Sequence, residues 1–207
     1  MTTEFFTTGL LLKQSLGDIL PVMERADMPA LGAAHIQATS EGVWLTATDR
    51  YVIVRTKVYG GVDTLPESPF TAEISFAVAK MLSEIRDVAD VVITPDVITV
   101  DRDADFTLDP PSNLWGKVLP LFVSNLRGEG GRKAWADCGM NGDFLRHIEK
   151  IYFEPQGEQA TRRFADLSGR VVGIQMPMRW DRDGYEPRFF DAAEAIEQIT
   201  TIKEVRN

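Results

Sequence analysis

Three runs rich in β-branched and aromatic residues follow one another between residues 34 and 58, and they constrain the fold more than any other feature. The runs read AHIQAT, GVWLTATD and YVIVRTKV, and only short polar steps separate them. β-branched and aromatic side chains fit a pleated sheet, and short polar steps are typical of the turns between antiparallel strands. The sequence therefore predicts an antiparallel meander over residues 34–58.

A strand and a helix are predicted before this meander. FFTTG, residues 5–9, indicates a short strand, and Thr8 is a suitable N-cap for the helix that follows. In LLLKQSLGDIL the residues Leu12, Leu16 and Ile19 recur at helical spacing. Pro21 is expected to kink or end this helix, because proline lacks the backbone N–H that a helix interior uses.

A second helix and further strands are predicted after the meander. Ser75 is a suitable cap for a second helix, FAVAKMLSEIRD, whose apolar face includes Val78 and Leu82. VVITPDVITV then predicts a hairpin that turns at Pro95-Asp96, and DADFTLD extends the same sheet.

A break between two domains is expected near residue 125. Pro110-Pro111 begins it, and LRGEGGRK is the most linker-like stretch of the chain. We therefore assign residues 1–125 to one domain and residues 126–207 to a shorter one. The second is predicted to contain a strand KAWADCGM, a helix NGDFLRHIEKIYF, paired strands RRFADLS and RVVGIQMPMRW, and a final amphipathic helix with Ile196, Ile199 and Ile202.

Composition limits the function classes. The formal net charge of −9 disfavours indiscriminate nucleic-acid binding, although a local basic face is compatible with it. Cys138 is the only cysteine, so an intrachain disulfide and a cysteine-based zinc site are excluded. No signal peptide and no membrane-spanning run of about 18 apolar residues is apparent, so a cytoplasmic location is expected.

The sequence contains no pattern that supports catalysis. GEGGRK lacks the spacing of a phosphate-binding loop, and DRDAD, residues 101–105, lacks the glycine and the final glutamate of a calcium loop. His35 and His147 have no neighbouring residues that suggest a metal site or a catalytic triad. We therefore expect neither an enzyme nor a cofactor; an enzyme dependent on a metal at Asp101, Asp103 and Asp105 stays a distant alternative.

Three segments together resemble the bacterial sliding clamp, the beta subunit of the replicative DNA polymerase. LLKQSLGDILPVMERADMPALGAAHIQATSEGVWLTATDRYVIV is similar to the helix and meander of a clamp domain. LWGKVLP is similar to the segment that connects two clamp domains, and GIQMPMR resembles the last strand of the clamp. They occur in the order that the family has.

The resemblance implies an α+β, DNA-clamp-like fold, with antiparallel sheets outside and helices on the inner face. It implies two lobes, the first similar to the middle clamp domain and the second an abbreviated last domain, followed by a C-terminal helix. A clamp ring contains six similar domains, so a homo-oligomer, either a trimer or a dimer, is expected for a ring.

The resemblance also explains why GIQMPMRW sets a proline and an arginine inside an apolar segment. In the family this segment borders the pocket that holds a short peptide motif of polymerases and other clients. A flexible thioether suits an adaptable apolar groove, and an arginine suits its polar rim. The peptide-binding residues implied in this chain are Arg50, Tyr51, Val52, Lys117, Val118, Met176, Pro177, Met178 and Arg179.

The implied function is that of a processivity factor, which tethers a polymerase or other client to double-stranded DNA without reading its sequence. Helix cations would contact DNA phosphates; the candidates are Lys13, Arg25, Lys80, Arg86, Arg146 and Lys150. An alternative is a clamp-derived adaptor or decoy that binds replication proteins and never encircles DNA. The C-terminal helix is a further candidate for an adaptor surface.

Overall fold

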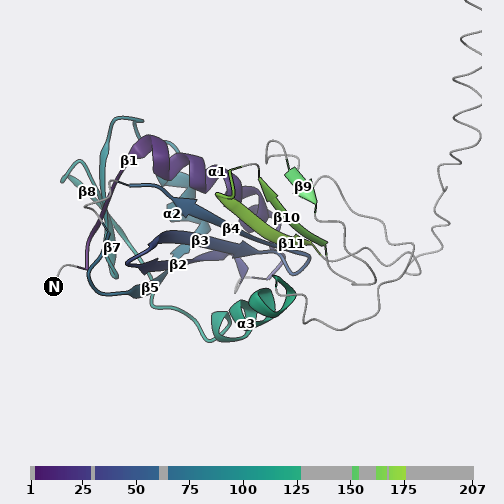
Figure 1. Ribbon diagram of the computed structural model, residues 1–207. Helices are drawn as coiled ribbons and strands as arrows, with labels where there is room; N and C mark the ends of the chain where they lie inside the picture. The colour runs from purple at the N-terminus through teal and green to yellow at the C-terminus, as the bar shows by residue number, and fades with distance from the viewer. Residues whose placement is uncertain are drawn as a thin grey trace, which may run out of the picture. The chain divides into compact units, whose positions relative to one another are not determined.

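The computed structural model describes residues 3–28, 31–60, 65–126, 151–153, 162–166 and 168–175. The chain divides into two units, Met1–Pro177 and Met178–Asn207, and all the described residues belong to the first. They form two antiparallel sheets and three helices, which confirms the predicted α+β class (Figure 1). None of these helices is both long enough and apolar enough to cross a membrane.

A unit of one strand, one helix and three further strands occurs twice. The first copy contains β1 (Phe5–Thr8), α1 (Gly9–Arg25), β2 (Ala33–Thr39), β3 (Gly42–Thr48) and β4 (Val52–Val58). The second contains β5 (Phe70–Ser75), α2 (Phe76–Leu82), β6 (Asp90–Ile93), β7 (Val97–Val100) and β8 (Ala104–Thr107). The remaining elements are α3 (Trp115–Leu126), β9 (Ile151–Phe153), β10 (Arg162–Asp166) and β11 (Val171–Gln175).

The two copies exchange their first strands. The smaller sheet has the order β1-β6-β7-β8, so the first strand of copy one joins the sheet of copy two. The larger sheet has the order β5-β2-β3-β4-β11-β10-β9, so the first strand of copy two joins the sheet of copy one. Strands from the second half of the chain extend the larger sheet, because β11 pairs antiparallel with β4.

Helix α1 begins as predicted and continues past Pro21, where a kink or an end was expected. The Thr8 hydroxyl accepts a hydrogen bond from the Leu11 N–H at 3.4 Å. Pro21 lies inside the helix and does not end it. The turn beyond the proline buries Val22 and Met23 in the core, and this burial offsets the hydrogen bond that proline cannot donate.

Helix α2 also begins at its predicted cap but is shorter than predicted. The Ser75 hydroxyl accepts a bond from the Val78 N–H at 3.4 Å, and the helix ends at Leu82. The chain then turns so that Ala89 is buried and its carbonyl accepts the Gly9 N–H at 2.8 Å. The hairpin predicted at Pro95-Asp96 is confirmed by the pairing of β6 with β7.

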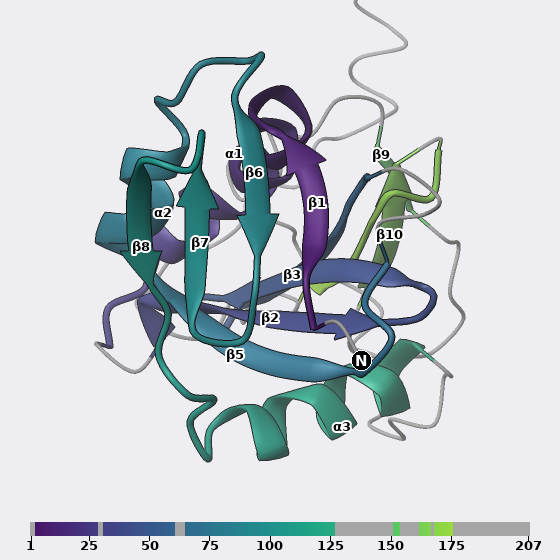
Figure 2. The same ribbon diagram turned by 90° about the vertical axis from the view of Figure 1, so that its left-hand side faces the viewer.

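The main core lies on the inner face of both sheets, where α1 and α2 pack side by side (Figure 2). In β2 the side chains of Ala34, Ile36 and Ala38 enter this core. Successive side chains of a strand point to opposite faces, so His35 and Gln37 lie on the outer face. The predicted arrangement of helices on an inner face is therefore correct for α1 and α2.

Helix α3 packs against the outer face instead. The segment LWGKVLP, expected as a connection, forms the first part of this helix, and Pro120 lies inside it. Ile151, expected at the end of a helix, belongs to β9, whose residue Phe153 pairs with Phe164 of β10. The strand KAWADCGM, residues 141–150 and the C-terminal helix lie outside the described residues, and the domain boundary at residue 125 stays a prediction.

Candidate functional site

The first turn of α3 is anchored to the outer face of the larger sheet. Trp115 is buried, and its ring lies against the His35 ring with 5.3 Å between the centroids. The preceding loop is held by Glu73 of β5, whose backbone exchanges hydrogen bonds of 2.7 and 2.9 Å with Asp109. The buried Glu73 carboxylate also accepts the Ser112 N–H. These contacts fix where α3 begins.

Further along, α3 covers the joint between β4 and β11. Ile53 of β4, Ile174 of β11 and Phe122 of α3 form a small buried cluster on the outer face, separate from the main core. Val118 and Val172 pack against it while remaining partly exposed. We call these five residues the outer cluster. It joins the two halves of the sequence, because β4 precedes α3 and β11 follows it.

A glycine makes this joint possible. A Cβ on Gly173 of β11 would overlap the Phe164 ring and come within 2.5 Å of the Ile53 carbonyl oxygen. The absence of a side chain therefore lets Phe164 of β10 reach across β11 into the main core. Ile174, the next residue along β11, consequently faces α3 on the outer face.

Apolar side chains of α3 also face solvent beside the outer cluster. Leu121 is 56% exposed and Val123 is 42% exposed. Lys117, one of the predicted peptide-binding residues, is exposed on the same helix, next to Val118. The surface of α3 therefore combines apolar area with a cation, which suits recognition of an amphipathic peptide.

The turn between β3 and β4 presents the other predicted residues of the first half. Asp49 is buried and accepts the N–H groups of Tyr51 and Val52 at 3.0 and 2.8 Å. Arg50 adopts a positive φ of 83°, and Tyr51 projects outward with 52% of its surface exposed. Val52 is only 1% exposed and belongs to the main core.

Of the predicted peptide-binding residues that the structure describes, Val118 belongs to the outer cluster, which also contains Ile53, the neighbour of Val52. The resemblance implied Val52, but the alternation of β4 places Val52 in the main core and Ile53 toward α3. Met176, Pro177, Met178 and Arg179 lie outside the described residues, directly after Gln175 at the end of β11.

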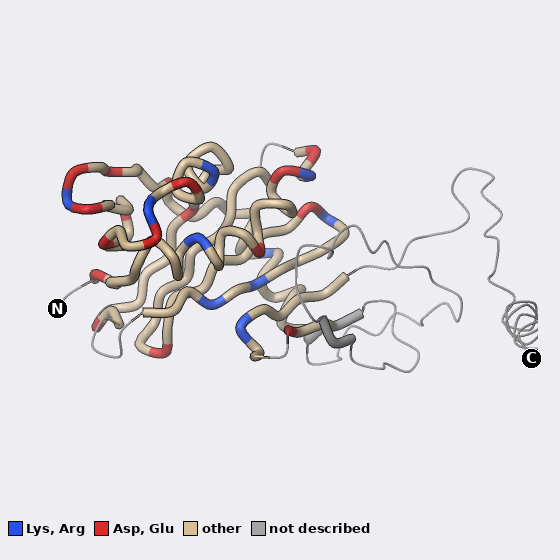
Figure 3. Tube along the Cα trace, turned by 90° about the horizontal axis from the view of Figure 1, so that it is seen from above, with Lys and Arg blue, Asp and Glu red and all other residues tan. Residues whose placement is uncertain are grey.

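Of the four predicted DNA-binding cations that the structure describes, Lys13, Arg25 and Arg86 form ion pairs with carboxylates of the same chain. Lys13 Nζ lies 2.7 Å from Asp87 Oδ1, and Arg25 Nε lies 3.1 Å from Asp49 Oδ2. Lys80 Nζ lies 6.0 Å from the centroid of its neighbouring Phe76 ring. Figure 3 shows the same mixture, with several Lys and Arg positions beside Asp or Glu along the described trace. Arg146 and Lys150 lie outside the described residues.

The acidic run at residues 101–105 has a structural role. Arg86 Nη2 lies 2.7 Å from Asp101 Oδ2, and the Asp90 N–H donates to Asp101 Oδ1 at 3.0 Å. These hydrogen bonds lower the pKa of Asp101, and the hydrogen bond and charge of Asp101 raise the pKa of Arg86. Asp105 accepts the Thr99 hydroxyl at 2.7 Å. Within the described part of the chain, no group of three His, Cys, Asp or Glu could hold a metal ion.

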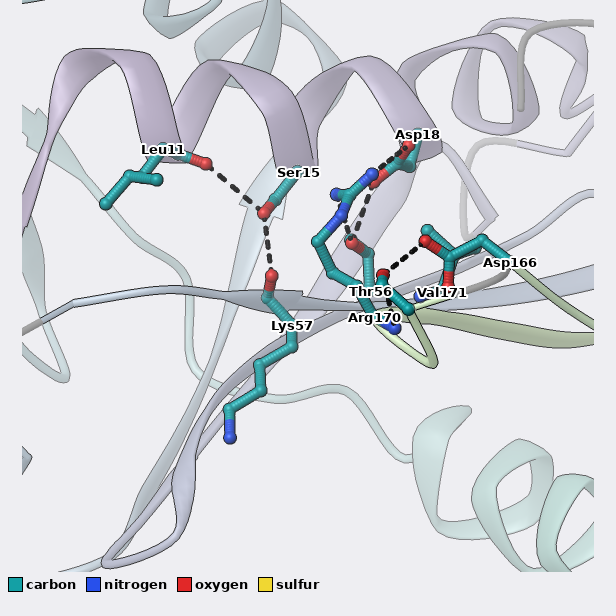
Figure 4. A network of polar contacts seen from close by, with 9 residues as sticks. Leu11, Ser15, Asp18, Thr56, Lys57, Asp166, Arg170 and Val171 are labelled. Carbon is teal, nitrogen blue, oxygen red and sulfur yellow. Dashed lines mark hydrogen bonds and ion pairs between the residues drawn. The ribbon is translucent and has the colours of Figure 1, made fainter. Parts of the chain in front are cut away.

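A polar network joins α1 to the second half of the chain on the inner side of the larger sheet (Figure 4). Arg170, in the turn before β11, donates through both terminal nitrogens to Asp18 of α1, with Nη2 at 3.2 Å from Oδ1. Thr56 of β4 donates to Asp18 at 2.8 Å and accepts from Arg170 at 3.1 Å. Sequence reasoning missed this network, since 152 positions separate Asp18 from Arg170.

The turn that carries Arg170 is itself held by hydrogen bonds. Asp166 accepts the Ser168 hydroxyl at 2.6 Å and the Val171 N–H at 2.9 Å. Burial raises the pKa of Asp166, but these hydrogen bonds and the charge of Arg170 outweigh it and lower the pKa. The carboxylate therefore stays charged and keeps the turn in the shape that directs Arg170 toward α1.

A second group that sequence reasoning missed lies on the outer face. Arg55 of β4 donates to Gln37 Oε1 at 2.8 Å and lies over the Trp44 ring, 5.0 Å from its centroid. Lys57 Nζ lies 5.5 Å from the same centroid. Burial, followed by the charge of Arg55, lowers the pKa of the nearby His35 to about 4, so His35 is neutral at neutral pH.

Comparison with known proteins gives matches among solved structures. No protein-family model and no curated protein sequence matches this chain. The DNA polymerase III subunit beta of Pseudomonas aeruginosa matches with a TM-score of 0.61 at 12% identity, over 85% of this chain and 66% of that one. The sliding clamp of Bartonella birtlesii, solved bound to griselimycin, matches with a TM-score of 0.62 at 15% identity, over 90% and 66%.

The sliding clamp of Bacillus subtilis is similar to the same degree, with a TM-score of 0.61 at 13% identity over 90% of this chain. In each of these comparisons the matched region is 66% of the clamp, just under two thirds of its length. Similarity of this kind concerns the fold. The chain therefore has the fold of the bacterial DNA polymerase III beta sliding clamps, as the three segments of its sequence predicted.

Proposed function

We propose that this protein is a non-enzymatic, clamp-like tethering protein that holds client proteins by a short peptide on the outer face of the larger sheet. The observation that carries the proposal is the outer cluster at the joint of α3, β4 and β11. Apolar side chains from three separate chain segments converge there, and Leu121 and Val123 extend the apolar surface into solvent. Converging apolar side chains with a few polar groups are typical of peptide-binding surfaces.

The proposed site combines described and sequence-predicted residues. Val118 and Ile53 would provide the apolar floor, and Tyr51, Arg50 and Lys117 would provide the rim. Met176, Pro177, Met178 and Arg179, which follow β11 in the sequence, stay predicted peptide-binding residues on the strength of the family resemblance alone. Methionine suits such a position because its thioether side chain adapts to different partners.

A peptide titration tests this proposal. A fluorescent peptide carrying a clamp-binding motif is titrated with the full chain, and griselimycin, which the Bartonella clamp binds, serves as a competitor. Met178→Ala and Val118→Ala should each weaken the peptide by about 1 to 2 kcal/mol, roughly five- to thirtyfold, since each removes one apolar anchor. Val88→Ala, which truncates an exposed side chain of the turn after α2, is the matched control.

Melting curves of all variants accompany the titration. If Met178 lines an open groove, its truncation should cost far less stability than the roughly 2 to 5 kcal/mol expected for a buried methionine. Absence of peptide binding by the natural sequence at high micromolar concentration would refute the proposed site. Unfolding of the Met178→Ala variant would show that the motif belongs to the core.

The ion pairs of three predicted DNA-binding cations favour a second candidate function, a clamp-derived adaptor or decoy that does not encircle DNA. Lys13, Arg25 and Arg86 each lie within 3.1 Å of a carboxylate oxygen of the same chain. A cation that already neutralises a carboxylate releases fewer counterions when it meets a phosphate. The affinity of this face for DNA should therefore be much lower than its number of cations suggests.

Retention on nicked circular DNA and the molecular mass in solution separate the two functions. A processivity factor should form a closed oligomer, remain on the circle and slide off after linearisation, and replacement of Lys13, Lys80, Arg146 and Lys150 together by Glu should abolish retention. An adaptor should be monomeric and pass through unretained, yet still bind the peptide. Retention that survives the fourfold replacement would remove these helix faces from any DNA-binding role.

A further inference from the structure

Arg55 is an unusual cation for its position. It is half-buried on the outer face, and burial lowers the pKa of its guanidinium. Its described hydrogen bonds go to neutral groups, to Gln37 Oε1 at 2.8 Å and to Thr46 Oγ1 at 3.4 Å. Among the described residues, no carboxylate forms an ion pair with it. A desolvated charge without an opposite charge is costly, so such a group has an affinity for an anion.

Lys57 places a second cation beside it. Both side chains lie at the Trp44 ring, Arg55 at 5.0 Å and Lys57 at 5.5 Å from the centroid. The Lys57 stem also runs over Gly42, where an added Cβ would lie 2.7 Å from Lys57 Cε. Lys57, too, has no ion pair with a carboxylate in the described part of the chain. The two side chains and the ring between them form what we call the cationic patch.

Four other arginines in the described part of the chain differ from Arg55 in their partners. Arg25, Arg50, Arg86 and Arg170 each form an ion pair with an aspartate. Local pairing is therefore common where a cation stabilises the fold. The cationic patch departs from this rule on the face where the outer cluster lies.

The strand register places the patch next to the outer cluster. Arg55 lies opposite Val172 of β11, which packs against the cluster, and Ile53 of the cluster is two residues before Arg55 on the same face. Trp44 and Lys57 lie opposite each other one step further along the same face. The outer face therefore runs from apolar to cationic within a few residues of β4.

We propose that Arg55 and Lys57 bind an acidic side chain of the client peptide, next to the apolar anchors that the outer cluster receives. This inference rests on the proposed function and adds the charge of the ligand to it. Residues two apart on one strand are about 7 Å apart, which suits one or two carboxylates. A nucleic acid would need a longer basic track, since its affinity grows with the number of phosphates neutralised.

Selection from a display library of short random peptides on the full chain tests the inference. The selected peptides should contain apolar residues together with Asp or Glu at a fixed distance from them. Changing that acidic residue to its amide should weaken binding about tenfold for the natural sequence. The same peptide change should leave the affinity of the Arg55→Gln and Lys57→Gln variants almost unchanged. In the Arg55→Lys variant it should again weaken binding, though less than in the natural sequence.

Two controls keep the outcome clear. Arg102→Gln removes one exposed cation from the turn between β7 and β8, so it matches the change in net charge without touching the patch. Melting curves show whether the Arg55→Gln variant remains folded. If it unfolds, the Lys57→Gln variant still tests the inference, because that substitution removes no hydrogen bond described above.

The other possible results of the selection distinguish failure of this inference from failure of the proposed function. Apolar peptides selected without an acidic preference would overturn the inference and leave the proposed function intact. No selected peptides at all would overturn both. Binding of a labelled single-stranded oligonucleotide that is lost in Lys57→Gln, without acidic peptides, would assign the patch to nucleic acid and overturn the inference.

Discussion

The two faces of the larger sheet have different compositions and different interactions. The inner face carries small and branched apolar side chains such as Ala34 and Ile36, which α1 and α2 cover completely. The ionic group formed there by Asp18 and Arg170 is paired within the chain. The outer face carries His35, Trp44 and Arg55, of which Arg55 has no described carboxylate partner, and α3 covers it only in part. The inner face therefore builds the fold, while the outer face retains groups that a ligand could use.

The largest difference in free energy of unfolding is expected when one inward-facing and one outward-facing side chain of β5 are truncated. Ile74→Ala on β5 should lower the free energy of unfolding by about 2 to 5 kcal/mol, because Ile74 is buried in the main core. Thr71→Ala, on the opposite face of the same strand, should change it by less than about 0.5 kcal/mol. Urea denaturation of both variants measures the difference, and equal losses would contradict this division of roles.

The ionic contact on the inner face should have the next largest effect. Asp18→Asn should cost about 2 to 3 kcal/mol, somewhat less than a fully buried pair, because Arg170 keeps partial contact with water. Hydrogen exchange should accelerate at the amides of Val171–Gln175 more than at those of β2 and β3, since the contact holds β11 in place. Lys13→Gln, in a more exposed pair, should cost less than about 1 kcal/mol. Uniform acceleration across the sheet would show that the contact has no local role.

A smaller loss of stability is expected at low pH, from protonation of His35 on the outer face. The pKa of buried His35 is lowered to about 4, so the unfolded chain binds a proton there more readily than the folded chain does. Stability should therefore fall as the pH drops from about 7 to about 5, by about 2 kcal/mol from this group. His35→Gln should remove this part of the pH dependence. An unchanged slope in that variant would mean that His35 is already accessible to protons, and that α3 does not seal it.

Local signals in the sequence predicted most of the first half. Thr8 and Ser75 cap their helices, and the meander and the hairpin at Pro95-Asp96 occur as expected, because each depends on neighbours in the chain. The prolines were less informative, since Pro21 was expected to kink or end its helix and Pro120 was expected in a connecting segment. Pro21 and Pro120 both lie inside helices, since burial of the adjacent turns outweighs the preference of proline for a helix end.

The candidate site was less predictable, because it depends on contacts between distant residues. The resemblance implied Val118 and Val52 as peptide-binding residues; Val118 packs beside Ile53, whereas Val52 faces the main core. The pairing of Lys13 with Asp87, 74 positions away, was likewise invisible in the sequence. Helical spacing shows that a lysine is on a surface, and only the fold shows whether its charge is already balanced.

The exchange of first strands between the two strand-helix-strand units has a consequence for folding. β1 completes the sheet of the second unit, and β5 completes the sheet of the first, so neither unit contains all the strands of its own sheet. Folding must therefore bring both ends of this region together before either sheet is complete, which favours a single cooperative transition. A chain cut between β4 and β5 should give two fragments that remain unfolded alone and assemble only when mixed, a property that would make this region suitable as a split reporter.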